Sequence, residues 1–148
     1  MAVFQTSLKV RSYECDMYGH VNNATFLNYL EYGRVELLNE LGYTLDSLKA
    51  DGFLLPIIKI EIEYKQQVLM GDHLTITVEW ERRGRSSATF RQNIFKDSSK
   101  SPVASAIASW VATDLTGTPI QIPQEFIQRY ERTFGPVSLV TKKIRSLD

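Results

Sequence analysis

The residues best suited to chemistry lie close together, in the segment that runs from Asp16 to Asn23. This segment contains a carboxylate at Asp16, an imidazole at His20 and two amides at Asn22 and Asn23. A carboxylate can act as a general base towards water or as a nucleophile. The chain after Asn22 has the pattern of a helix, and the free N–H groups at a helix N-terminus stabilise an oxyanion. The two devices together suit the hydrolysis of an activated acyl group.

Each of these residues also has a structural interpretation. Asp16 can serve only to compensate the helix dipole, and His20 can be a hydrogen-bonding or turn residue. Asn22 and Asn23 are suited to cap the helix, because their short side chains accept the first free N–H groups. A substrate contact by either side chain, Asn22 or Asn23, is a second role. A metal site built from Asp16 and His20 would be short of ligands, because no Cys/His cluster supports it. We therefore expect no metal and no redox cofactor.

Two other groups of charged residues are candidates. Glu31 is expected about two turns into the helix, where it can pair with Arg34 at the i, i+3 spacing, face solvent, or lie near a substrate as a partly buried acid. The spacing favours the ion pair. Arg82, Arg83 and Arg85 form the only dense basic cluster. They are either a solvated hairpin tip or a site for the phosphate groups of a nucleotide-bearing ligand.

One long helix is expected to position the Asp16 segment. It would run from Asn23 to Leu41, roughly 29 Å at about 1.5 Å per residue, and end at Gly42 in a left-handed conformation. Gly33 in its middle costs about 1 kcal/mol relative to Ala, which the close approach of another backbone would explain. Apolar residues recur along one stripe, which consists of Phe26, Leu27, Leu30, Leu37, Leu38 and Leu41.

The remaining elements are mostly strands. Alternating apolar and polar residues predict strands over about 3–11, 56–65, 73–81, 86–96 and 103–114. In the second of these, Ile58, Ile60, Ile62 and Tyr64 are expected on one face. A short helix is expected over 44–51, and an amphipathic helix over 123–134 with Pro123 at its first position. The tail from Gly135 is expected to be loosely held.

These elements predict an α+β architecture. A long helix beside a single large alternating sheet has one economical arrangement, in which the sheet curls around the helix. We expect the four strands after the helix to form an antiparallel meander. The edges of such a sheet need a partner, so at least a dimer is expected. The whole chain, 1–148, is predicted to be one domain, with a core of about 4–115 and a C-terminal helix and tail over 123–148.

Composition narrows the class of protein further. Lys plus Arg equals Asp plus Glu, 17 of each, so nothing in the charge calls for nucleic acid or a membrane surface. Cys15 is the single cysteine, which excludes an intrachain disulfide and a Cys-based zinc site. The first residues lack the apolar run of a signal peptide, and no stretch of about 18 apolar residues predicts a membrane span. A cytoplasmic location is expected.

The stretch YECDMYGHVNNATFLNYLE over 13–31 resembles the signature of hotdog-fold thioesterases of the 4-hydroxybenzoyl-CoA thioesterase type. Its Asp-x-x-x-His-Val-Asn-Asn form is also similar to the plant and bacterial acyl-ACP thioesterases. The resemblance covers about residues 4–115. Later in the chain, Tyr64, the pair Gly71-Asp72 and the pattern Gly84-x-Ser86 support it.

The resemblance implies residue roles. Asp16 matches the catalytic aspartate, and Asn23 falls where a backbone N–H polarises the thioester carbonyl. His20 matches a catalytic histidine of the acyl-ACP branch, in which Glu31 also has a counterpart, whereas members of the benzoyl branch can have an aliphatic residue in place of His20. The acyl-ACP branch has an asparagine two residues after the aspartate, where this chain has Tyr18.

The resemblance also implies an assembly and a substrate. Family members are dimers or tetramers, with the acyl site at the dimer interface and the CoA nucleotide near the surface, where Arg82 to Arg85 are candidates to bind it. We therefore expect an acyl-CoA thioesterase that acts as a homodimer or homotetramer and hydrolyses an aliphatic or aromatic thioester to the free acid and CoA. The alternatives are an acyl-ACP thioesterase and a non-catalytic acyl-CoA-binding hotdog protein.

Overall fold

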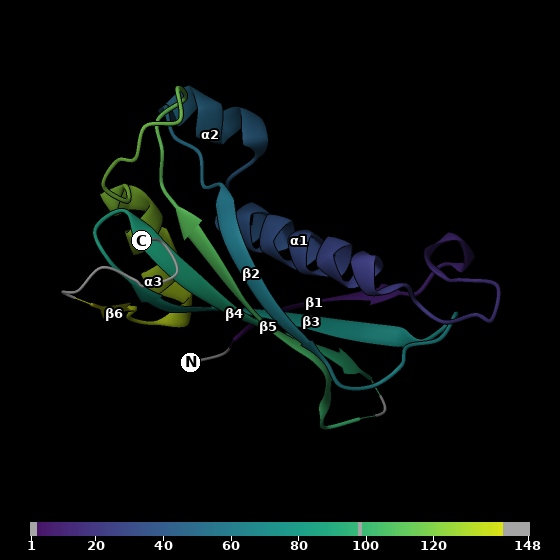
Figure 1. Cartoon of the computed structure of the whole chain (residues 1–148). Helices are drawn as coiled ribbons and strands as arrows, with labels where there is room; N and C mark the ends of the chain where they lie inside the picture. Colours follow the sequence, from purple (N-terminus) through teal and green to yellow (C-terminus); the bar gives the residue numbers. More distant parts are fainter. Residues whose placement is uncertain (1–2, 98, 141–148) are drawn as a thin grey trace.

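A curved antiparallel sheet with a long helix along one face forms the centre of the molecule (Figure 1). The structure is a computed structural model and describes residues 3–97 and 99–140. In chain order its elements are β1 (Phe4–Lys9), the 3-10 turn η1 (Ser12–Glu14), α1 (Asn23–Glu40), α2 (Leu45–Asp51), β2 (Ile57–Tyr64), β3 (His73–Arg83), β4 (Ser87–Lys96), β5 (Pro102–Val111), α3 (Gln124–Phe134) and β6 (Ser138–Leu139). The predicted α+β class, the five strands and the three helices are confirmed.

The order of strands across the sheet differs from the predicted meander. The order is β1-β3-β4-β5-β2, so only β3, β4 and β5 are joined by consecutive hairpins. β2 lies at the far edge, where Ile60 is opposite Ala108 of β5, and β1 pairs with β3, where Phe4 is opposite Val78. Residues 65–72 return the chain from that edge to β3. The prediction was wrong because local alternation identifies a strand but not its neighbour in the sheet.

Both ends of α1 are fixed by the residues that the sequence predicts. Asn22 is the N-cap, and its side-chain oxygen accepts a hydrogen bond from the N–H of Ala24 at 2.9 Å. Gly42, with φ of 86°, follows the C-cap Leu41. A positive φ suits glycine because no Cβ opposes it. These local signals set the length of α1 and the place where it begins.

The buried face of α1 is displaced from the predicted stripe. Leu27 was expected to be buried but is 39% exposed, whereas Tyr29 and Gly33 are buried. A Cβ at Gly33 would lie only 2.7 Å from Cγ2 of Ile76, so the close neighbour is a β3 side chain rather than a second backbone. The buried residues keep the three- and four-residue spacing of one helix face and are Phe26, Tyr29, Leu30, Gly33 and Leu37.

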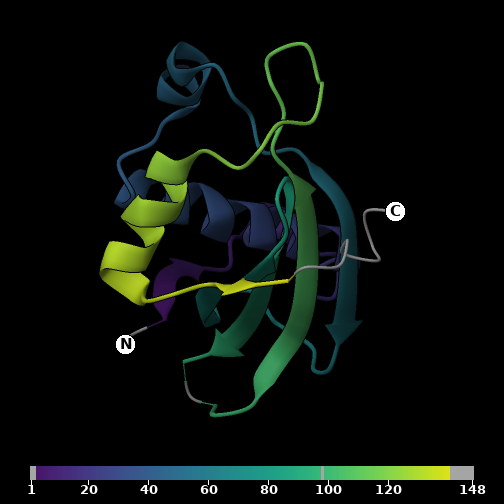
Figure 2. The ribbon, with the colours of Figure 1, turned by 90° about the vertical axis from the view of Figure 1, so that its left-hand side faces the viewer.

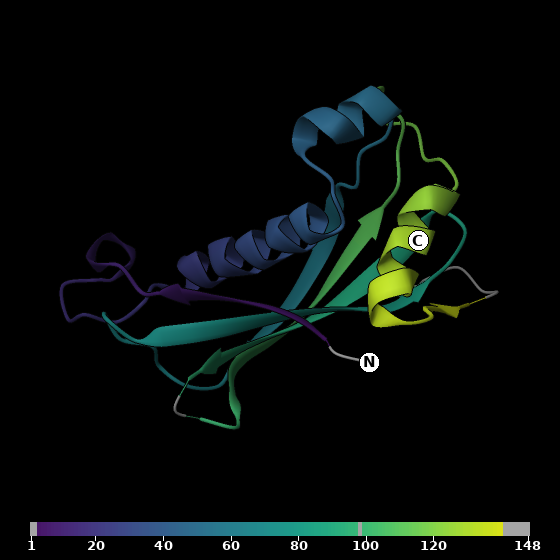
Figure 3. The same cartoon turned by 180° about the vertical axis from the view of Figure 1, so that it is seen from behind.

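The helix α3 covers the other end of the same sheet face (Figures 2 and 3). Its Phe126 and Tyr130 pack against Trp80, which also contacts Trp110 with ring centroids 5.3 Å apart. The register of β3 and β4 shifts between Trp80 and Arg82. Beside this bulge the hydroxyl of Tyr130 accepts a hydrogen bond from the backbone N–H of Trp80 at 2.9 Å. The helix therefore satisfies a buried sheet donor as well as covering aromatic side chains.

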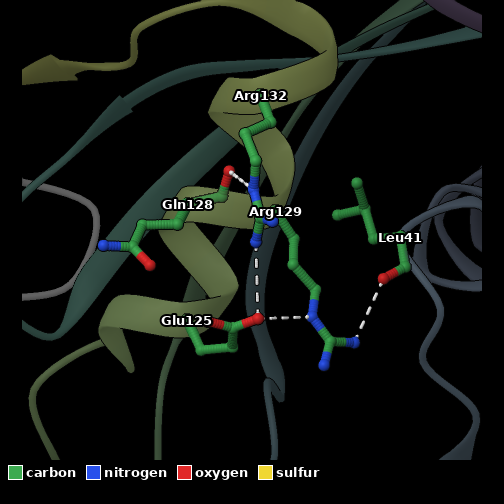
Figure 4. A network of polar contacts seen from close by, with 5 residues as sticks. All are labelled: Leu41, Glu125, Gln128, Arg129 and Arg132. Atoms are coloured by element: carbon green, nitrogen blue, oxygen red, sulfur yellow. Dashed lines mark hydrogen bonds and ion pairs between the residues drawn. The ribbon is translucent and has the colours of Figure 1, made fainter.

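A polar network joins α3 to the end of α1 (Figure 4). Nη1 of Arg129 donates to the backbone oxygen of Leu41 at 3.2 Å, and Nε donates to Glu125 at 3.0 Å. The same guanidinium lies over the ring of Tyr43, 4.4 Å from its centroid. Carbonyl groups in the last turn of a helix have no partner within the helix. Arg129 therefore supplies one of the missing donors and holds the two helices together.

Two further predictions need correction. The tail was expected to be loose, but Ser138–Leu139 pair in parallel with Arg82–Arg83 of β3; residues 141–148 lie outside the described part of the chain. Ile58 was expected on the inner face with Ile60, yet it is 46% exposed. The pairing of β2 with β5 shifts register between Ile57 and Lys59, and such a bulge re-aims the extra residue.

Candidate active site

Asp16 lies in a closed loop between η1 and α1. Its N–H donates to the backbone oxygen of His20 at 2.9 Å, and its Oδ1 accepts from the N–H groups of Tyr18 at 2.9 Å and His20 at 3.1 Å. Cys15 and Val21 form an antiparallel bridge across the base of the loop. These bonds place Asp16 beside the segment that leads directly into α1.

The two carboxylate oxygens of Asp16 differ in their surroundings. Oδ1 is held by the loop, whereas Oδ2 accepts no hydrogen bond within the described residues. The side chain is exposed. Asp16 therefore combines a fixed orientation with one free oxygen, as a general base or nucleophile requires.

The first N–H group of α1 lies at the end of the same loop. Ala24 donates to the side chain of Asn22, and Thr25 donates to its backbone oxygen at 2.9 Å. The N–H of Asn23 has no acceptor among the residues described, and it lies at the positive end of an 18-residue helix. This N–H is therefore unpaired within the described chain, while Asn22 acts as the cap.

A partly buried hydrogen bond fixes η1, the turn that leads into the Asp16 loop, to α1. The Tyr29 hydroxyl, on a side chain that is only 1% exposed, donates to Oε1 of Glu14 at 3.0 Å. Glu14 also forms an ion pair with Arg11 at 2.8 Å. Burial and the Glu14 hydrogen bond raise the pKa of Tyr29, so the hydroxyl remains a donor. Sequence reasoning missed this pair, because neither the position of Tyr29 in mid-helix nor that of Glu14 predicts their contact.

His20 contacts Asp16 only through its backbone. Together with Asn23, Phe26 and Tyr64 it lines a pocket of about 290 Å³ beside the N-terminus of α1. The Tyr64 hydroxyl donates to the backbone oxygen of Asn23 at 3.2 Å, which joins the end of β2 to the start of α1. Tyr64 is a second site residue to which the sequence assigned no role.

Glu31 and Arg34 do not form the predicted ion pair. Nη1 of Arg34 donates instead to Oε1 of the buried Gln92 at 3.0 Å, and no ion pair of Glu31 occurs within the described chain. Burial lowers the pKa of Arg34, and the negative charge of nearby Glu31 offsets this effect only in part. Glu31 is exposed and lies about 12 Å along α1 from Asn23 at ~1.5 Å per residue. Within one chain it stands apart from Asp16.

The arginine cluster is also separate from Asp16. His20 pairs with Leu69 just before β3 begins. At the opposite end of β3 lies the arginine cluster, Arg82, Arg83 and Arg85. The length of this strand, about 30 Å at ~3.3 Å per residue, separates the cluster from the Asp16 loop. Arg82 and Arg85 are exposed. Nε of Arg83 is buried without a partner among the described residues. One chain thus brings together Asp16, His20, Asn22 and Asn23 but not the arginines.

An apolar pocket of about 540 Å³ lies beside the second half of α1. Its walls come from α1, α2, the linker 54–56 and Ile57 at the start of β2, and Phe90 and Trp110 of the sheet contribute to its lining. Glu31 and Arg34 are its charged lining residues. Sequence reasoning missed this pocket because its walls come from two helices and from strands β2, β4 and β5, which meet only in the folded chain.

Other groups near the loop suggest no separate chemistry. Burial, followed by the neighbouring Glu14 and Asp16 carboxylates, raises the pKa of the Cys15 thiol, which disfavours the thiolate. In the part of the chain that the structure covers, no group of three or more His, Cys, Asp or Glu side chains is placed to hold a metal ion. No helix in that part is long and apolar enough to cross a membrane.

A sheet curled around a long helix, with an aspartate just before the helix N-terminus, defines the hotdog class of thioesterases. The model of the thioesterase-like superfamily matches residues 10–130 of this chain. The chain therefore belongs to this superfamily, as the resemblance predicts.

Individual relatives agree with this assignment. The chain is 33% identical to the long-chain acyl-CoA thioesterase FadM of Escherichia coli over 75% of its own length and 83% of FadM. It is 30% identical to the chloroplastic acyl-acyl carrier protein thioesterase ATL3 of Arabidopsis thaliana, over 85% of this chain but only 66% of that relative. The 1,4-dihydroxy-2-naphthoyl-CoA thioesterase Slr0204 of Synechocystis shares the fold, with a TM-score of 0.79, 18% identity, and coverage of 86% of this chain and 95% of that one.

Proposed function

We propose that this protein is an acyl-CoA thioesterase. The observation that carries the proposal is the free Oδ2 of Asp16 in a loop that ends at the free N–H of Asn23. The N–H would accept the developing charge on the thioester oxygen. Asp16 would either take a proton from the attacking water or attack the carbonyl carbon itself. In the first route water adds to the carbonyl carbon, the C–S bond breaks, and the departing thiolate takes up the proton. In the second route the C–S bond breaks to leave an anhydride between the acyl group and Asp16, which water then hydrolyses. In both routes the products are the carboxylic acid and CoA thiol.

The choice of CoA as carrier rests on two arguments. FadM is an acyl-CoA thioesterase by name, and the chain matches a larger share of its length, 83%, than of the length of ATL3, 66%. Tyr18 stands where the acyl-ACP branch has an asparagine. Acyl-ACP remains the alternative carrier. A thiol-release screen with matched acyl-CoA and acyl-ACP thioesters tests the choice, and faster turnover of acyl-ACP would overturn it.

We also propose that the protein is at least a dimer, formed through β2. This strand is a sheet edge with no partner on its outer side among the described residues, and Ile58 and Tyr64 on it are 46% and 42% exposed. Leu27 and Val35, two apolar residues of α1, are 39% and 45% exposed. An open edge strand that carries exposed apolar side chains favours pairing with a second copy. Sedimentation at micromolar concentration tests this proposal, and a monomer would contradict it.

Such a dimer would complete the site. Tyr64 at one end of β2 contacts Asn23, whereas Ile57 at the other end lines the apolar pocket. Antiparallel pairing of β2 with its copy places the Tyr64 end of one chain opposite the Ile57 end of the other. The Asp16 loop of one copy would then face the apolar pocket and the β3–β4 hairpin of its partner.

In this arrangement, Arg82 and Arg85 are the candidates to bind the CoA phosphates. Exposed guanidinium contacts of this kind are modest and screened by salt. Replacing both residues by alanine should raise KM for acyl-CoA about tenfold at low salt with little change in kcat, because the nucleotide is remote from the reacting carbon. The same variant should act normally on an acyl-pantetheine substrate. Equal kinetics of variant and wild type on acyl-CoA would contradict this role and would show that the arginines form only a solvated hairpin tip.

The primary test is a screen over short, long, branched and aromatic acyl-CoA thioesters. Thiol release that depends on Asp16 supports the proposal. Binding of acyl-CoA without release of thiol would support the non-catalytic alternative instead.

A further inference from the structure

The apolar pocket beside α1 takes no part in the chemistry described above. It lies between Val35 and Leu38 of α1 and Leu45 and Leu48 of α2, and Trp110 of the sheet lines it from below. Leu48 and Trp110 are 5% and 1% exposed and belong to the hydrophobic core. Because the pocket reaches core side chains, its inner end has a fixed limit.

The chemistry of the lining selects an aliphatic ligand. Glu31 and Arg34 are the charged residues of the lining, and both lie on α1. Glu31 is exposed, and Arg34 already donates to Gln92 with Glu31 nearby. Deeper in the pocket Leu48 is apolar, and the side-chain polar atom of Trp110 is Nε1, which is buried without a partner among the described residues. An acyl group with several hydroxyls would find at most this one side-chain partner there, and a buried hydroxyl without a partner is unfavourable. An unsubstituted chain needs no such partner.

The volume of the pocket limits the length of that chain. A methylene group displaces about as much volume as a water molecule, ~30 Å³ in the liquid, so the pocket of about 540 Å³ holds at most about 18 such groups. Ligand pockets are not filled completely, so roughly 10 to 14 carbons is the range that fits. A single aromatic ring would leave most of the space empty.

We infer that the substrate carries a linear, medium-length aliphatic acyl chain, and that this pocket holds its tail while the Asp16 loop of the partner copy acts on its thioester. This inference rests on the thioesterase function and the β2 dimer proposed above. Leu45 and Leu48 of α2 are then the residues that limit chain length. Each methylene transferred into the pocket should raise kcat/KM by up to about fourfold, until the pocket is full.

The first experiment measures kcat/KM for a series of linear acyl-CoA thioesters and for benzoyl-CoA. In the wild type we expect a rise to a maximum near dodecanoyl-CoA and a low value for benzoyl-CoA. Leu45 is exposed, so Leu45→Trp can fill the pocket without disturbing the core. This variant should lower the ratio of kcat/KM for dodecanoyl-CoA to that for butyryl-CoA at least tenfold. The matched control Leu115→Trp, at an exposed leucine outside the pocket, should leave the ratio unchanged.

A second experiment does not depend on activity. The chain has two tryptophans, so Trp80→Phe leaves Trp110 of the pocket as the single fluorophore. A fatty acid that carries bromine on its last carbon, ω-bromododecanoic acid, should quench Trp110 saturably, and dodecanoic acid should compete with it. para-Bromobenzoic acid should not quench. The wild type should give the same titration with smaller amplitude, which controls for any effect of the substitution at Trp80.

The outcomes separate the two proposals. Absence of thiol release from every thioester would overturn the proposed function, while quenching of Trp110 would still support an aliphatic pocket. Thiol release with a flat chain-length profile, equal ratios for Leu45→Trp and Leu115→Trp, or no quenching of Trp110 would each overturn the pocket assignment alone.

Mixed dimers show which copy supplies the pocket. We would combine Asp16→Asn chains with Leu45→Trp chains and assay dodecanoyl-CoA. If the pocket serves the partner's Asp16 loop, each mixed dimer keeps one intact site and activity returns on mixing. If each chain uses its own pocket, both sites of the mixed dimer are defective, activity stays low, and the shared site is refuted.

Discussion

Replacing Asp16 by asparagine and by alanine should separate the catalytic role of this side chain from its structural role. In the folded loop, Oδ1 accepts hydrogen bonds of 2.9 and 3.1 Å from two backbone N–H groups. Asparagine keeps an oxygen that can accept both bonds, but it removes the charge and cannot act as a base or nucleophile. Alanine removes both bonds. The two variants should therefore share a loss of activity and differ in stability.

The sizes of both effects follow from general magnitudes. Loss of a general base or nucleophile costs at least ~10² in rate, so both variants should lose at least this much in kcat for an acyl-CoA. A hydrogen bond contributes about 0.5–1.5 kcal/mol net, and these are exposed, so alanine should cost roughly 1–2 kcal/mol in the free energy of unfolding and asparagine clearly less. For a chain of this size, the alanine variant should melt roughly 3–6 °C below the asparagine variant.

The assay combines single-turnover thiol release with thermal unfolding followed by circular dichroism. Turnover of Asp16→Asn close to that of the wild type would refute the catalytic assignment. Equal melting temperatures of the two variants would show that the Oδ1 hydrogen bonds do not hold the loop. Strong destabilisation of Asp16→Asn would make Asp16 a structural residue, since its amide keeps the same acceptor.

Other residues give independent tests. Tyr29→Phe leaves Glu14 without its buried donor, so it should lower the free energy of unfolding by about 1 kcal/mol. It should also lower kcat while KM changes little, because the Asp16 loop loosens, and an unchanged kcat would argue against this positioning role. Gly33→Ala should destabilise by about 1–3 kcal/mol in urea unfolding through overpacking against Ile76, although alanine is the better helix former; a more stable variant would contradict this close packing of α1 on β3. Hydrogen bonds from the Thr116 hydroxyl and nearby backbone groups lower the pKa of Asp114 below its usual 3.8. A carboxyl whose pKa is lower in the folded than in the unfolded protein contributes stability at pH values above its unfolded pKa. This contribution is lost as the pH falls through the pKa of the folded protein. Asp114→Asn should therefore reduce the fall in melting temperature that acid pH causes. If the melting temperature falls as steeply as in the wild type, other carboxylates are responsible for the loss of stability in acid.

Parts of the structure that depend on neighbouring residues in the chain could be predicted from the sequence. Asn22 and Gly42 mark the ends of α1 because capping and left-handed stops are local. Asp16 and Asn23 could be placed in one site because few residues separate them and a helix begins at Asn23. The chemistry proposed for them follows from the carboxylate of Asp16 and from the free backbone N–H groups at the start of a helix.

Features formed by contacts between distant segments could not be predicted. Nothing near Ile58 marks the bulge that exposes it, and β2 could not be assigned to the far edge from its own alternation. The bond between Tyr29 and Glu14 and the pocket against Trp110 arise only when helix and sheet pack together. Arg34 was paired with Glu31 on spacing, but a buried amide on β4 offered it a better placed acceptor.

The place of β2 in the sheet has a consequence for the order of folding. β3, β4 and β5 are joined by short hairpins, whereas Ile60 must find Ala108, far along the chain. Contacts between distant residues close a longer loop and form more slowly, so we expect β2 to dock on β5 late. Until it does, the edge of β5 is open to other chains. β2 also carries Tyr64 beside Asn23 and Ile57 beside the pocket, so a refolding chain should regain its hairpins first and its activity only after β2 has docked on β5.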